Sequence, residues 1–494
     1  MREPLTTNHT SPIGRRLADA VDVHVSLSNG HDLSGEIYRQ LRSAVLERRL
    51  RQGDRLPPTR ELARRLGVSR TTTSAAYDRL ISEGFAVART GAGTFVSQVS
   101  GERPRRPATA TVVSPLPAWQ RIRLPDYLWE EAEFDFRPGV PDVGLFPFPT
   151  WRRLMSRQFQ PAAVGRGVNG HPAGHEPLRG AIAHHAGLAR GIRATADDVV
   201  VTNGSQQAID LIGRVLLRPG DQVAFEDPGY GPPYSLLRAM GARVRGVPVD
   251  REGLVVDEIP AGTRLVYVTP AHQMPLGMTM SLARRLALLA WARRNDAAII
   301  EDDYDSEFRF GGRPIEPLHM LDDSGRVIYV ASFSKTTLPT LRLGFIIAPP
   351  TLWPALHGAK FLTDWHTAMP LQAAMAEFIT EGHFARHVRR MRLVYEARHR
   401  LMTEILRTRF ASQLQAIPSA AGLHISATAT DASVERMELV VRRAARLGVG
   451  CLPLSLWGLQ REPSPGLVLG YGAIGTDRIE AGLDRLRRAM QAIR

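Results

Sequence analysis

The feature of this 494-residue chain that most limits its possible folds is an alternation of short apolar segments with helical patterns after residue 134. Strands are expected at residues 199–202, 222–225, 265–268, 298–300 and 327–333, with helices such as 205–217 and 282–293 between them. This alternation is typical of a mostly parallel sheet with helices on both faces. Beyond about residue 370, arginine-rich helices and the strands 423–426 and 467–469 predict a smaller α+β subdomain.

A different pattern occupies residues 32–97. Three helices are expected, the second capped by Thr59 and the third by Ser69, followed by strands 85–87 and 94–96 around a glycine-containing turn. This order is that of a winged helix-turn-helix, although many three-helix bundles bind no DNA. Residues 1–129 carry a net charge of +8 out of +14 for the chain, which favours a polyanionic partner. The residues expected to contact DNA are Arg60, Ser69, Arg70, Thr71, Thr72, Gly91 and Gly93.

The composition suggests four segments: an N-terminal arm (1–31), the DNA-binding head (32–97), a linker rich in Pro and Arg (98–133), and the α/β part (134–494). No apolar run is long enough to span a bilayer, and the N-terminus lacks the apolar core of a secretory signal. The single cysteine, Cys451, lies in an apolar run and is expected to be a buried packing residue. These features together predict a cytoplasmic protein.

Lys335 stands where the expected strand 327–333 gives way to a polar turn, among Ser332, Ser334 and, further on, Arg342. The chain has 63 basic residues, of which only Lys335 and Lys360 are lysines. An ammonium group can lose its proton and form an imine, whereas a guanidinium cannot. A surface lysine would be the usual interpretation of an isolated Lys, but this position favours a Schiff-base lysine.

Three further strand ends carry groups that suit pyridoxal phosphate (PLP). Gly204, Ser205 and Gln206 open a helix whose N–H groups can bind phosphate, although serine is also a common helix cap. Tyr230 can stack on a flat ring, or simply pack beside a Pro-Gly turn. The acidic stretch 301–307 usually indicates a solvated loop or a metal site, but no histidine stands at ligand spacing. Within it, Asp302 can keep a pyridine nitrogen protonated and Tyr304 can hold the phenolic oxygen of the ring.

The head closely resembles the GntR family of bacterial regulators. The matching strings are Leu56-Pro-Pro-Thr-Arg-Glu-Leu-Ala-Arg-Arg-Leu-Gly-Val-Ser-Arg-Thr-Thr and, in the wing, Arg89-Thr-Gly-Ala-Gly-Thr-Phe. The family usually places a capping serine where Pro58 stands, so Thr59 is expected to take that role.

Residues 134–494 resemble fold-type I PLP-dependent aminotransferases, and with the GntR-type head the chain resembles the MocR subfamily of transcriptional regulators. The matching motifs include Asn203-Gly-Ser-Gln-Gln, Glu226-Asp-Pro-Gly-Tyr, Thr269-Pro-Ala-His-Gln, Glu301-Asp-Asp-Tyr-Asp-Ser-Glu-Phe and Ser332-Phe-Ser-Lys. The resemblance implies that Lys335 forms the internal aldimine, Asp302 pairs with the pyridine nitrogen and Tyr304 binds the phenolic oxygen. It further implies that Tyr230 stacks on the ring and that Ser205, Ser332 and Arg342 hold the phosphate.

Three departures from the aminotransferase pattern bear on catalysis. Val468 stands where an arginine that binds the substrate carboxylate is expected, and Arg461 is a nearby substitute. The usual Tyr-Gly-Asp-Pro is replaced by Asn169-Gly-His-Pro, and the usual Pro-Thr-Gly by Pro275-Leu-Gly. These departures affect turnover more than cofactor binding.

The sequence therefore predicts a homodimeric regulator that binds operator DNA and senses PLP, or an amine or amino acid that forms an external aldimine. The three departures predict that the aminotransferase-like domain is not a functional aminotransferase. No catalytic residue is assured, and Lys335 is assigned only as the Schiff-base lysine. One alternative is an active aminotransferase that carries a DNA-binding module. A second is a DNA-binding protein whose large domain serves only as a dimerisation scaffold, against which Lys335, Asp302 and Tyr304 argue together.

Overall fold

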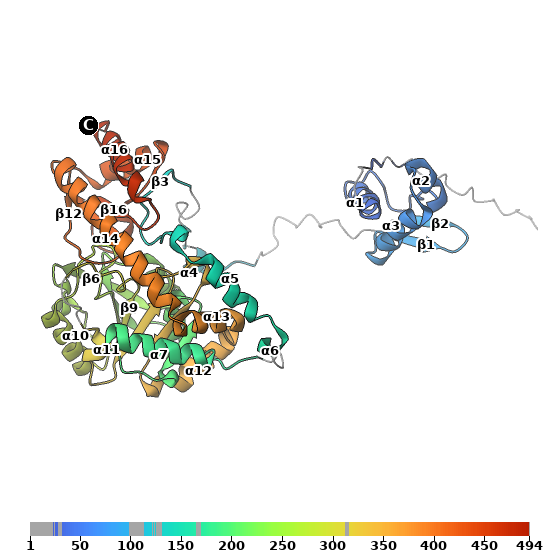
Figure 1. The fold of residues 1–494 in the computed structure, drawn as a ribbon. Coiled ribbons are helices and arrows are strands. Elements are labelled where there is room, and N and C mark those ends of the chain that lie inside the picture. Colours follow the sequence, from blue (N-terminus) through green and yellow to red (C-terminus); the bar gives the residue numbers. More distant parts are fainter. Residues whose placement is uncertain are drawn as a thin grey trace, which may run out of the picture. The chain divides into compact units, whose positions relative to one another are not determined.

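The computed structural model describes residues 23, 25–27, 32–97, 113–120, 122, 124, 131–164, 169–311 and 316–493. The chain divides into two compact units, Met1–Ser114 and Pro115–Arg494 (Figure 1). Most of the expected N-terminal arm and of the expected linker lies outside the described residues. Among the helices of the described segments, none combines the length and the apolar character needed to cross a membrane.

The first unit consists of three helices and a hairpin: α1 (Leu33–Leu46), α2 (Thr59–Leu66), α3 (Arg70–Ser82), β1 (Ala86–Arg89) and β2 (Gly93–Val96). The apolar side of α1 is buried against α3, and Ile37 and Leu41 are fully enclosed. Val25 belongs to the same core, so packing in this unit begins before the expected start at residue 32. β1 and β2 pair antiparallel, with Arg89 opposite Gly93.

The helix caps match the sequence analysis at one position and correct it at another. Ser69 caps α3 as predicted, because its Oγ accepts a hydrogen bond from the Thr72 backbone N–H at 3.1 Å. The prediction for Thr59 was wrong. Thr59 is the first residue of α2, and Pro58 occupies the cap position without a side-chain hydrogen bond. A proline lacks a polar side chain but has a backbone angle (φ −54°) that suits the entry of a helix.

The second unit contains an eight-stranded sheet in the order β4-β11-β10-β9-β8-β5-β6-β7. Its strands are β4 (Val199–Thr202), β5 (Gln222–Asp227), β6 (Arg243–Asp250), β7 (Gly253–Leu254), β8 (Thr263–Val268), β9 (Ala298–Asp303), β10 (Val327–Ser332) and β11 (Gly344–Ile347). The pairs β5–β6, β5–β8, β8–β9 and β9–β10 are parallel. β11 runs antiparallel to both β10 and β4, so β4 points in the same direction as β10. The predicted mostly parallel sheet is confirmed.

Helices cover both faces of this sheet: α7 (Glu176–Arg190), α8 (Ser205–Leu216), α9 (Gly231–Ala239), α10 (Leu282–Arg294), α11 (Leu318–Leu321), α12 (Trp353–Asp364) and α13 (Met369–Thr380). α5 (Phe148–Arg157) packs against α13, and the short helix α6 (Pro161–Val164) is exposed. Alternate strand residues belong to different apolar layers. Tyr329 packs in the layer of α7 and α13, whereas Ile328 and Val330 pack in that of α8 and α12. A strand buried on both faces has to be apolar throughout, which explains the unbroken apolar run of β10.

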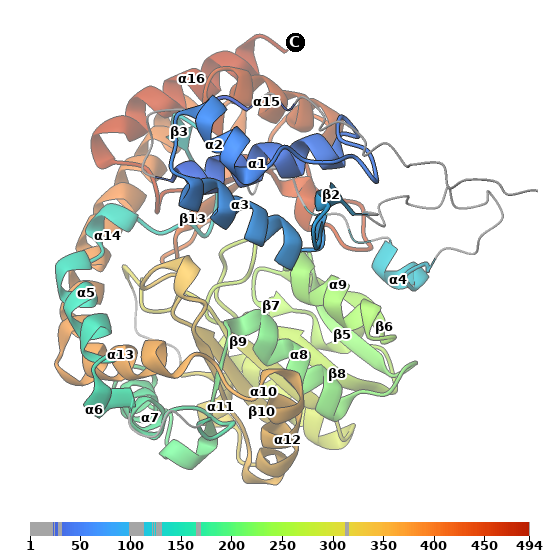
Figure 2. The ribbon, with the colours of Figure 1, turned by 90° about the vertical axis from the view of Figure 1, so that its right-hand side faces the viewer.

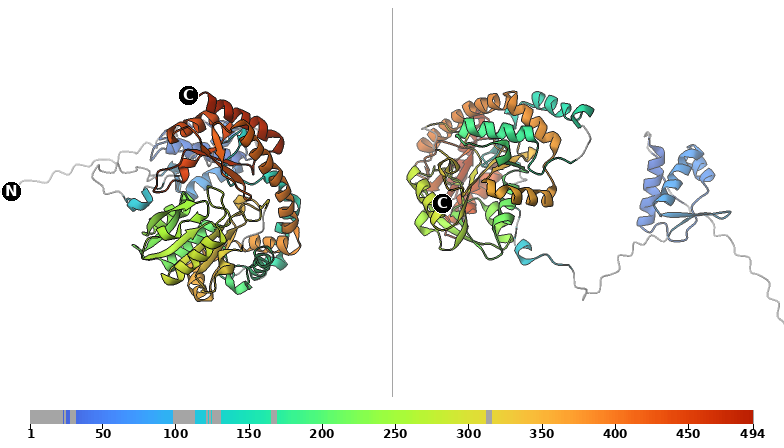
Figure 3. Two further views of the ribbon diagram at one scale, coloured as in Figure 1. Left: turned by 90° about the vertical axis from the view of Figure 1, so that its left-hand side faces the viewer. Right: turned by 90° about the horizontal axis from the view of Figure 1, so that it is seen from below.

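The C-terminal part forms a smaller α+β subdomain around the four-stranded sheet β12-β13-β16-β15. Its elements are α14 (His383–Arg409), β12 (Leu414–Ala416), β13 (His424–Ala429), α15 (Val434–Arg446), β14 (Val449–Gly450), β15 (Leu452–Pro453), β16 (Gly466–Gly470) and α16 (Ile479–Gln491), together with β3 (Phe134–Asp135), which pairs with β14. A short helix, α4 (Pro117–Gln120), precedes β3. Figure 2 shows α15 and α16, in red, apart from the green and yellow strands of the large sheet. The long helix α14 contacts both α13 and α16 and so joins the two subdomains (Figure 3, left).

One boundary differs in a way that matters for the site. β9 was expected to end at Ile300, but it continues to Asp303, so Glu301, Asp302 and Asp303 are strand residues and buried. The acidic stretch is therefore not a solvated loop at its start. Each of these carboxylates receives a hydrogen bond from within the protein.

Candidate functional site

The groups singled out in the sequence meet at one edge of the large sheet. β4, β5, β8, β9 and β10 all point the same way, so their carboxyl ends share an edge. Ligands of open α/β sheets bind outside this edge. The residues placed there are Gly204, Ser205 and Gln206 after β4, Tyr230 after β5, Asp302 and Tyr304 at the end of β9, and Ser332, Ser334 and Lys335 after β10.

Lys335 lies in a partly buried turn, and its Nζ donates a hydrogen bond to the Gly139 carbonyl oxygen at 2.5 Å. Burial lowers the pKa of Lys335, against the attraction of the carboxylates of Asp305 and Asp302. A lowered pKa raises the fraction of neutral, nucleophilic amine. Gly139 has φ +76°, a conformation that favours glycine, and a Cβ at that position would lie 2.7 Å from Nζ, so a larger residue would require the end of the lysine side chain to shift.

Asp302 is 3% exposed, and its two carboxylate oxygens differ. Oδ2 accepts a hydrogen bond from the Tyr267 hydroxyl at 2.6 Å, and Tyr267 is itself held by stacking on Phe225. Oδ1 is buried and has no hydrogen-bond partner among the described residues. Burial raises the pKa of Asp302 to about 7, against the opposing effects of Tyr267 and Lys335. A buried acceptor without a donor costs free energy, so a ligand that donates a proton here would be stabilising.

The turn between β4 and α8 supplies N–H groups at a helix N-terminus, and Arg342 lies against it. Gly204 has φ +79°, and Arg342 Nη2 donates to the Asn203 carbonyl oxygen at 3.2 Å. A Cβ on Gly204 would come within 2.6 Å of that Nη2, so the guanidinium packs directly on the turn. A helix N-terminus beside an arginine is an anion site in charge and geometry. Ser332 and Ser334, by contrast, bond to each other, with 2.8 Å between their Oγ atoms.

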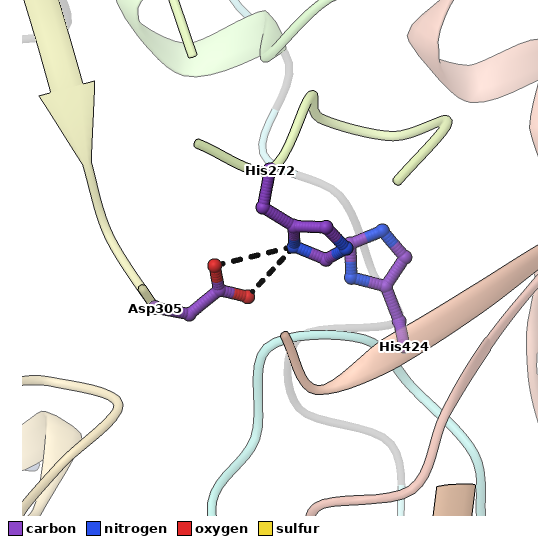
Figure 4. Close-up of side chains that lie close together, drawn as sticks. All are labelled: His272, Asp305 and His424. Atoms are coloured by element: carbon purple, nitrogen blue, oxygen red, sulfur yellow. Dashed lines mark hydrogen bonds and ion pairs between the residues drawn. The ribbon is translucent and has the colours of Figure 1, made fainter. Parts of the chain in front are cut away.

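A group that the sequence analysis missed adjoins these residues: His272, Asp305 and His424 (Figure 4). Asp305 lies 3.0 Å from His272 Nδ1, and the Tyr304 hydroxyl lies 3.0 Å from the same nitrogen. Tyr304 therefore belongs to this group as well as to the proposed ring site. His424 comes from β13, far along the chain, so no local spacing of histidines could have revealed it.

The three side chains are close enough to hold a metal ion, but protein partners already engage most of their ligand atoms. His424 Nε2 lies 2.8 Å from the Pro275 carbonyl oxygen, and His272 Nε2 lies 3.2 Å from Ser419 Oγ. Burial and the neighbouring His272 lower the pKa of His424 to about 3, so its imidazole is neutral at ordinary pH. We interpret the group as a hydrogen-bonded network that connects the carboxyl edge of the large sheet to the small subdomain.

Val468 lies fully buried in an apolar cluster with Leu452, Leu454 and Trp457. Met274 and Leu276 pack against the same cluster, and Met274 Sδ lies 3.8 Å from the Tyr304 hydroxyl. The position expected to hold a carboxylate-binding arginine is thus part of an apolar wall. Arg461 does not replace it in this structure, because its half-exposed side chain pairs with Glu258 at 3.6 Å.

In the first unit, the predicted DNA-contacting residues lie at two places. Ser69, Arg70, Thr71 and Thr72 form the start of α3, where Ser69 Oγ bonds both threonine hydroxyls at 2.6 and 2.8 Å. Gly91 (φ +75°) and Gly93 (φ +116°) lie at and just after the turn that joins β1 to β2. Arg60 is exposed in the first turn of α2. All these positions except Thr72, which is half-buried, are accessible to a ligand.

The comparisons with known proteins agree with this division into two units. Residues 33–96 match the family model described as bacterial regulatory proteins of the gntR family, and residues 139–453 match aminotransferase class I and II. The fold and the site thus define a helix-turn-helix protein with an aminotransferase-type domain. The chain is 38% identical over 470 residues to the "Probable rhizopine catabolism regulatory protein MocR" of Rhizobium meliloti, covering 93% of this chain and 94% of that protein. The chain belongs to the MocR-type subfamily of the GntR family of transcriptional regulators.

The chain is also 33% identical to the transcriptional regulator TauR of Rhodobacter capsulatus, and this match covers 93% of this chain and 96% of TauR. It is 30% identical to the pyridoxine biosynthesis transcriptional regulator PdxR of Corynebacterium glutamicum, with 90% of this chain and 93% of PdxR covered. Among solved structures, the second unit is similar to a kynurenine aminotransferase of Pyrococcus horikoshii in complex with PMP. The TM-score is 0.70 at 27% identity, with 76% of this chain and 96% of that chain covered. For LysN, an α-aminoadipate aminotransferase of Thermus thermophilus, the TM-score is 0.69 at 27% sequence identity, and the match covers 76% of this chain and 97% of that chain.

Proposed function

We propose that this regulator holds PLP at the carboxyl edge of its large sheet and that the cofactor, or an amine that reacts with it, controls operator binding. The observation that carries the proposal is the unpartnered buried Oδ1 of Asp302 at the same sheet edge as Lys335. A protonated pyridine nitrogen is a donor of the kind that Oδ1 lacks. The relatives named above support the regulatory part of the proposal.

Each residue then has a definite task. Asp302 would hold the ring nitrogen, Tyr230 would lie on the ring, and Tyr304 would donate to its phenolic oxygen. The residues that would hold the phosphate are Gly204, Ser205, Gln206, Ser332 and Arg342. PLP supplies an aldehyde that condenses with amines and a ring that withdraws electrons. Lys335 contributes an amine, and its lowered pKa increases the fraction that is neutral and nucleophilic.

The apolar cluster around Val468 indicates which class of ligand would fit beside the cofactor. A buried apolar surface cannot pair with a carboxylate, and leaving that charge unpaired is costly. We therefore infer an amine effector rather than sustained turnover of an α-amino acid, since poor orientation alone can lower a rate ~100-fold. A homodimer would present two heads to two half-sites of an operator.

The proposal is tested by locating the cofactor. Purified protein should be yellow, and borohydride reduction should fix PLP covalently to Lys335, which peptide mass spectrometry can identify. Lys335→Ala should remove the adduct. An adduct on Lys360, or none at all, would contradict the assignment.

The DNA-binding part makes a separate prediction at Arg70, the exposed first residue of α3. Arg70→Ala should weaken operator binding by ~1–3 kcal/mol if the side chain reads a base. If it contacts phosphate instead, the slope of log affinity against log salt should fall by about one unit. Arg49→Ala is a matched control, because it removes the same charge from an exposed pair with Glu47 beyond α1. Titrations in which both variants behave like the wild type would place Arg70 outside the interface.

A further inference from the structure

Lys360, the second lysine of the chain, is fully buried on α12. Its Nζ has three hydrogen-bond partners: Gln207 Oε1 at 2.8 Å, Asp364 Oδ2 at 2.8 Å and Thr367 Oγ1 at 3.1 Å. An ammonium group has three donors, so each donor has one acceptor here. A planar guanidinium with five donors would leave some of them unpaired in the same space. Lysine therefore matches the three acceptors of this site donor for donor.

The partners of Lys360 hold the turn between β4 and α8. Gln207 Oε1 also accepts the Asn203 backbone N–H at 2.8 Å. Asp364 Oδ2 accepts from Asn203 Nδ2 at 2.7 Å and from Gln207 Nε2 at 2.8 Å. The Lys360 ammonium donates to Gln207 Oε1 and so holds the Gln207 amide in one orientation. In that orientation Oε1 accepts from the Asn203 N–H, and Nε2 donates to Asp364.

The same turn is held from its other side by Arg342, through the Asn203 carbonyl oxygen. Asn203 therefore donates its backbone N–H to Gln207 and its side-chain amide to Asp364, and its carbonyl oxygen accepts from Arg342. Residues 204–206, whose N–H groups face the anion site, continue directly from this fixed residue. Backbone donors bind phosphate strongly only when they are already oriented.

We propose that Lys360 is a positioning residue for the phosphate of the bound ligand: it orients the turn at residues 203–206 through Gln207 and neutralises Asp364 beside it. The ligand class is a phosphate monoester, and the inference rests on the proposed function in PLP binding. Without the ammonium group, Gln207 could rotate away from the Asn203 N–H. Asp364 would then lose its cationic partner and keep only neutral amide donors, which would leave a net negative charge beside the turn.

The test compares two ligands on the full-length protein: PLP, and pyridoxal, which has the same ring and aldehyde but no phosphate. Lys360→Met should lower PLP affinity about 10-fold or more, because charged hydrogen bonds are lost. Its affinity for pyridoxal should change less than about 2-fold, since in the proposed site the turn would hold only the phosphate. Asp210→Asn is the control, because it removes an ion pair with Arg214 on α8 away from the turn, and it should alter neither affinity.

The outcomes separate the two proposals. Equal losses for PLP and pyridoxal, or an unchanged ratio of the two affinities, would overturn the positioning role while leaving the PLP site intact. A wild-type protein that binds neither ligand would instead contradict the proposed function. If Lys360→Met does not fold, as judged by circular dichroism, Gln207→Leu decides the question, because it cuts the same connection and keeps the ammonium paired with Asp364 and Thr367. An unchanged affinity ratio in a folded Gln207→Leu variant would overturn the role equally.

Discussion

Replacing Asp302 by asparagine should lower the affinity for PLP by about 100-fold or more. Removing one partner of a buried charge pair typically costs ~3–5 kcal/mol, and each ~1.4 kcal/mol is a factor of ten. Asparagine keeps the shape of the side chain and an acceptor for the Tyr267 hydroxyl, so the loss reports on the missing charge. Titration of the apoprotein with PLP, followed by absorbance, measures the change.

The same substitution should stabilise the protein without PLP, and the gain should depend on pH. Burial raises the pKa of Asp302 to about 7, from an ordinary value of 3.8. The folded state therefore disfavours the ionised form. This cost begins as the pH rises through about 4 and is complete above about 7. We expect the melting temperature of apo Asp302→Asn to exceed that of the wild type at pH 8 and to approach it near pH 4.

Asp303 offers a matched control in the same strand. It is as deeply buried as Asp302 but points to the opposite face, where its Oδ2 accepts from Tyr329 at 2.7 Å and lies 2.9 Å from Arg190 Nε. Asp303→Asn should destabilise the fold, because it breaks a buried pair. Asp303→Asn should not lower the affinity for PLP in the way that Asp302→Asn does. Similar PLP affinities for wild type and Asp302→Asn would show that Asp302 does not hold the cofactor.

The arrangement of the large sheet could be predicted because strands buried on both faces are apolar throughout and alternate with helices. Once those strands are parallel, residues at their carboxyl ends have to meet. Lys335 and Asp302 could therefore be assigned to one site from separate strand ends. The end of β9 could not be predicted, since Glu301, Asp302 and Asp303 read as a polar loop. Their burial depends on partners such as Tyr267 and Tyr329 from neighbouring strands.

The parts of the site that escaped prediction are contacts between distant segments. His272 and Asp305 follow the neighbouring strands β8 and β9, but His424 joins them only from β13 of the small subdomain, so no spacing in the sequence marks the group. Lys360 is similar: the rarity of lysine in this chain was visible, but its acceptor Gln207 lies 153 residues away on α8. Thr59 illustrates a local error, because a common capping residue was preferred to the proline that occupies the cap.

The last prediction concerns communication between the two units. The proposed cofactor site lies in one compact unit and the start of α3 in the other. A ligand can therefore affect DNA binding only by favouring one state of the whole protein over another. Such couplings are typically ~1–3 kcal/mol, or about 5–150-fold in affinity. Linkage makes the effect reciprocal: if PLP changes operator affinity by some factor, operator DNA must change PLP affinity by the same factor.

We therefore expect PLP titrations with and without saturating operator DNA to give different midpoints. The ratio of the midpoints should match the change in operator affinity that PLP causes. A scrambled duplex of equal length is the control for charge, since nonspecific binding is mainly electrostatic. Lys335→Ala should reduce the coupling, because it removes the amine to which PLP is proposed to attach. Equal PLP affinity on and off the operator would favour the alternative in which the large unit serves only to hold two DNA-binding heads together.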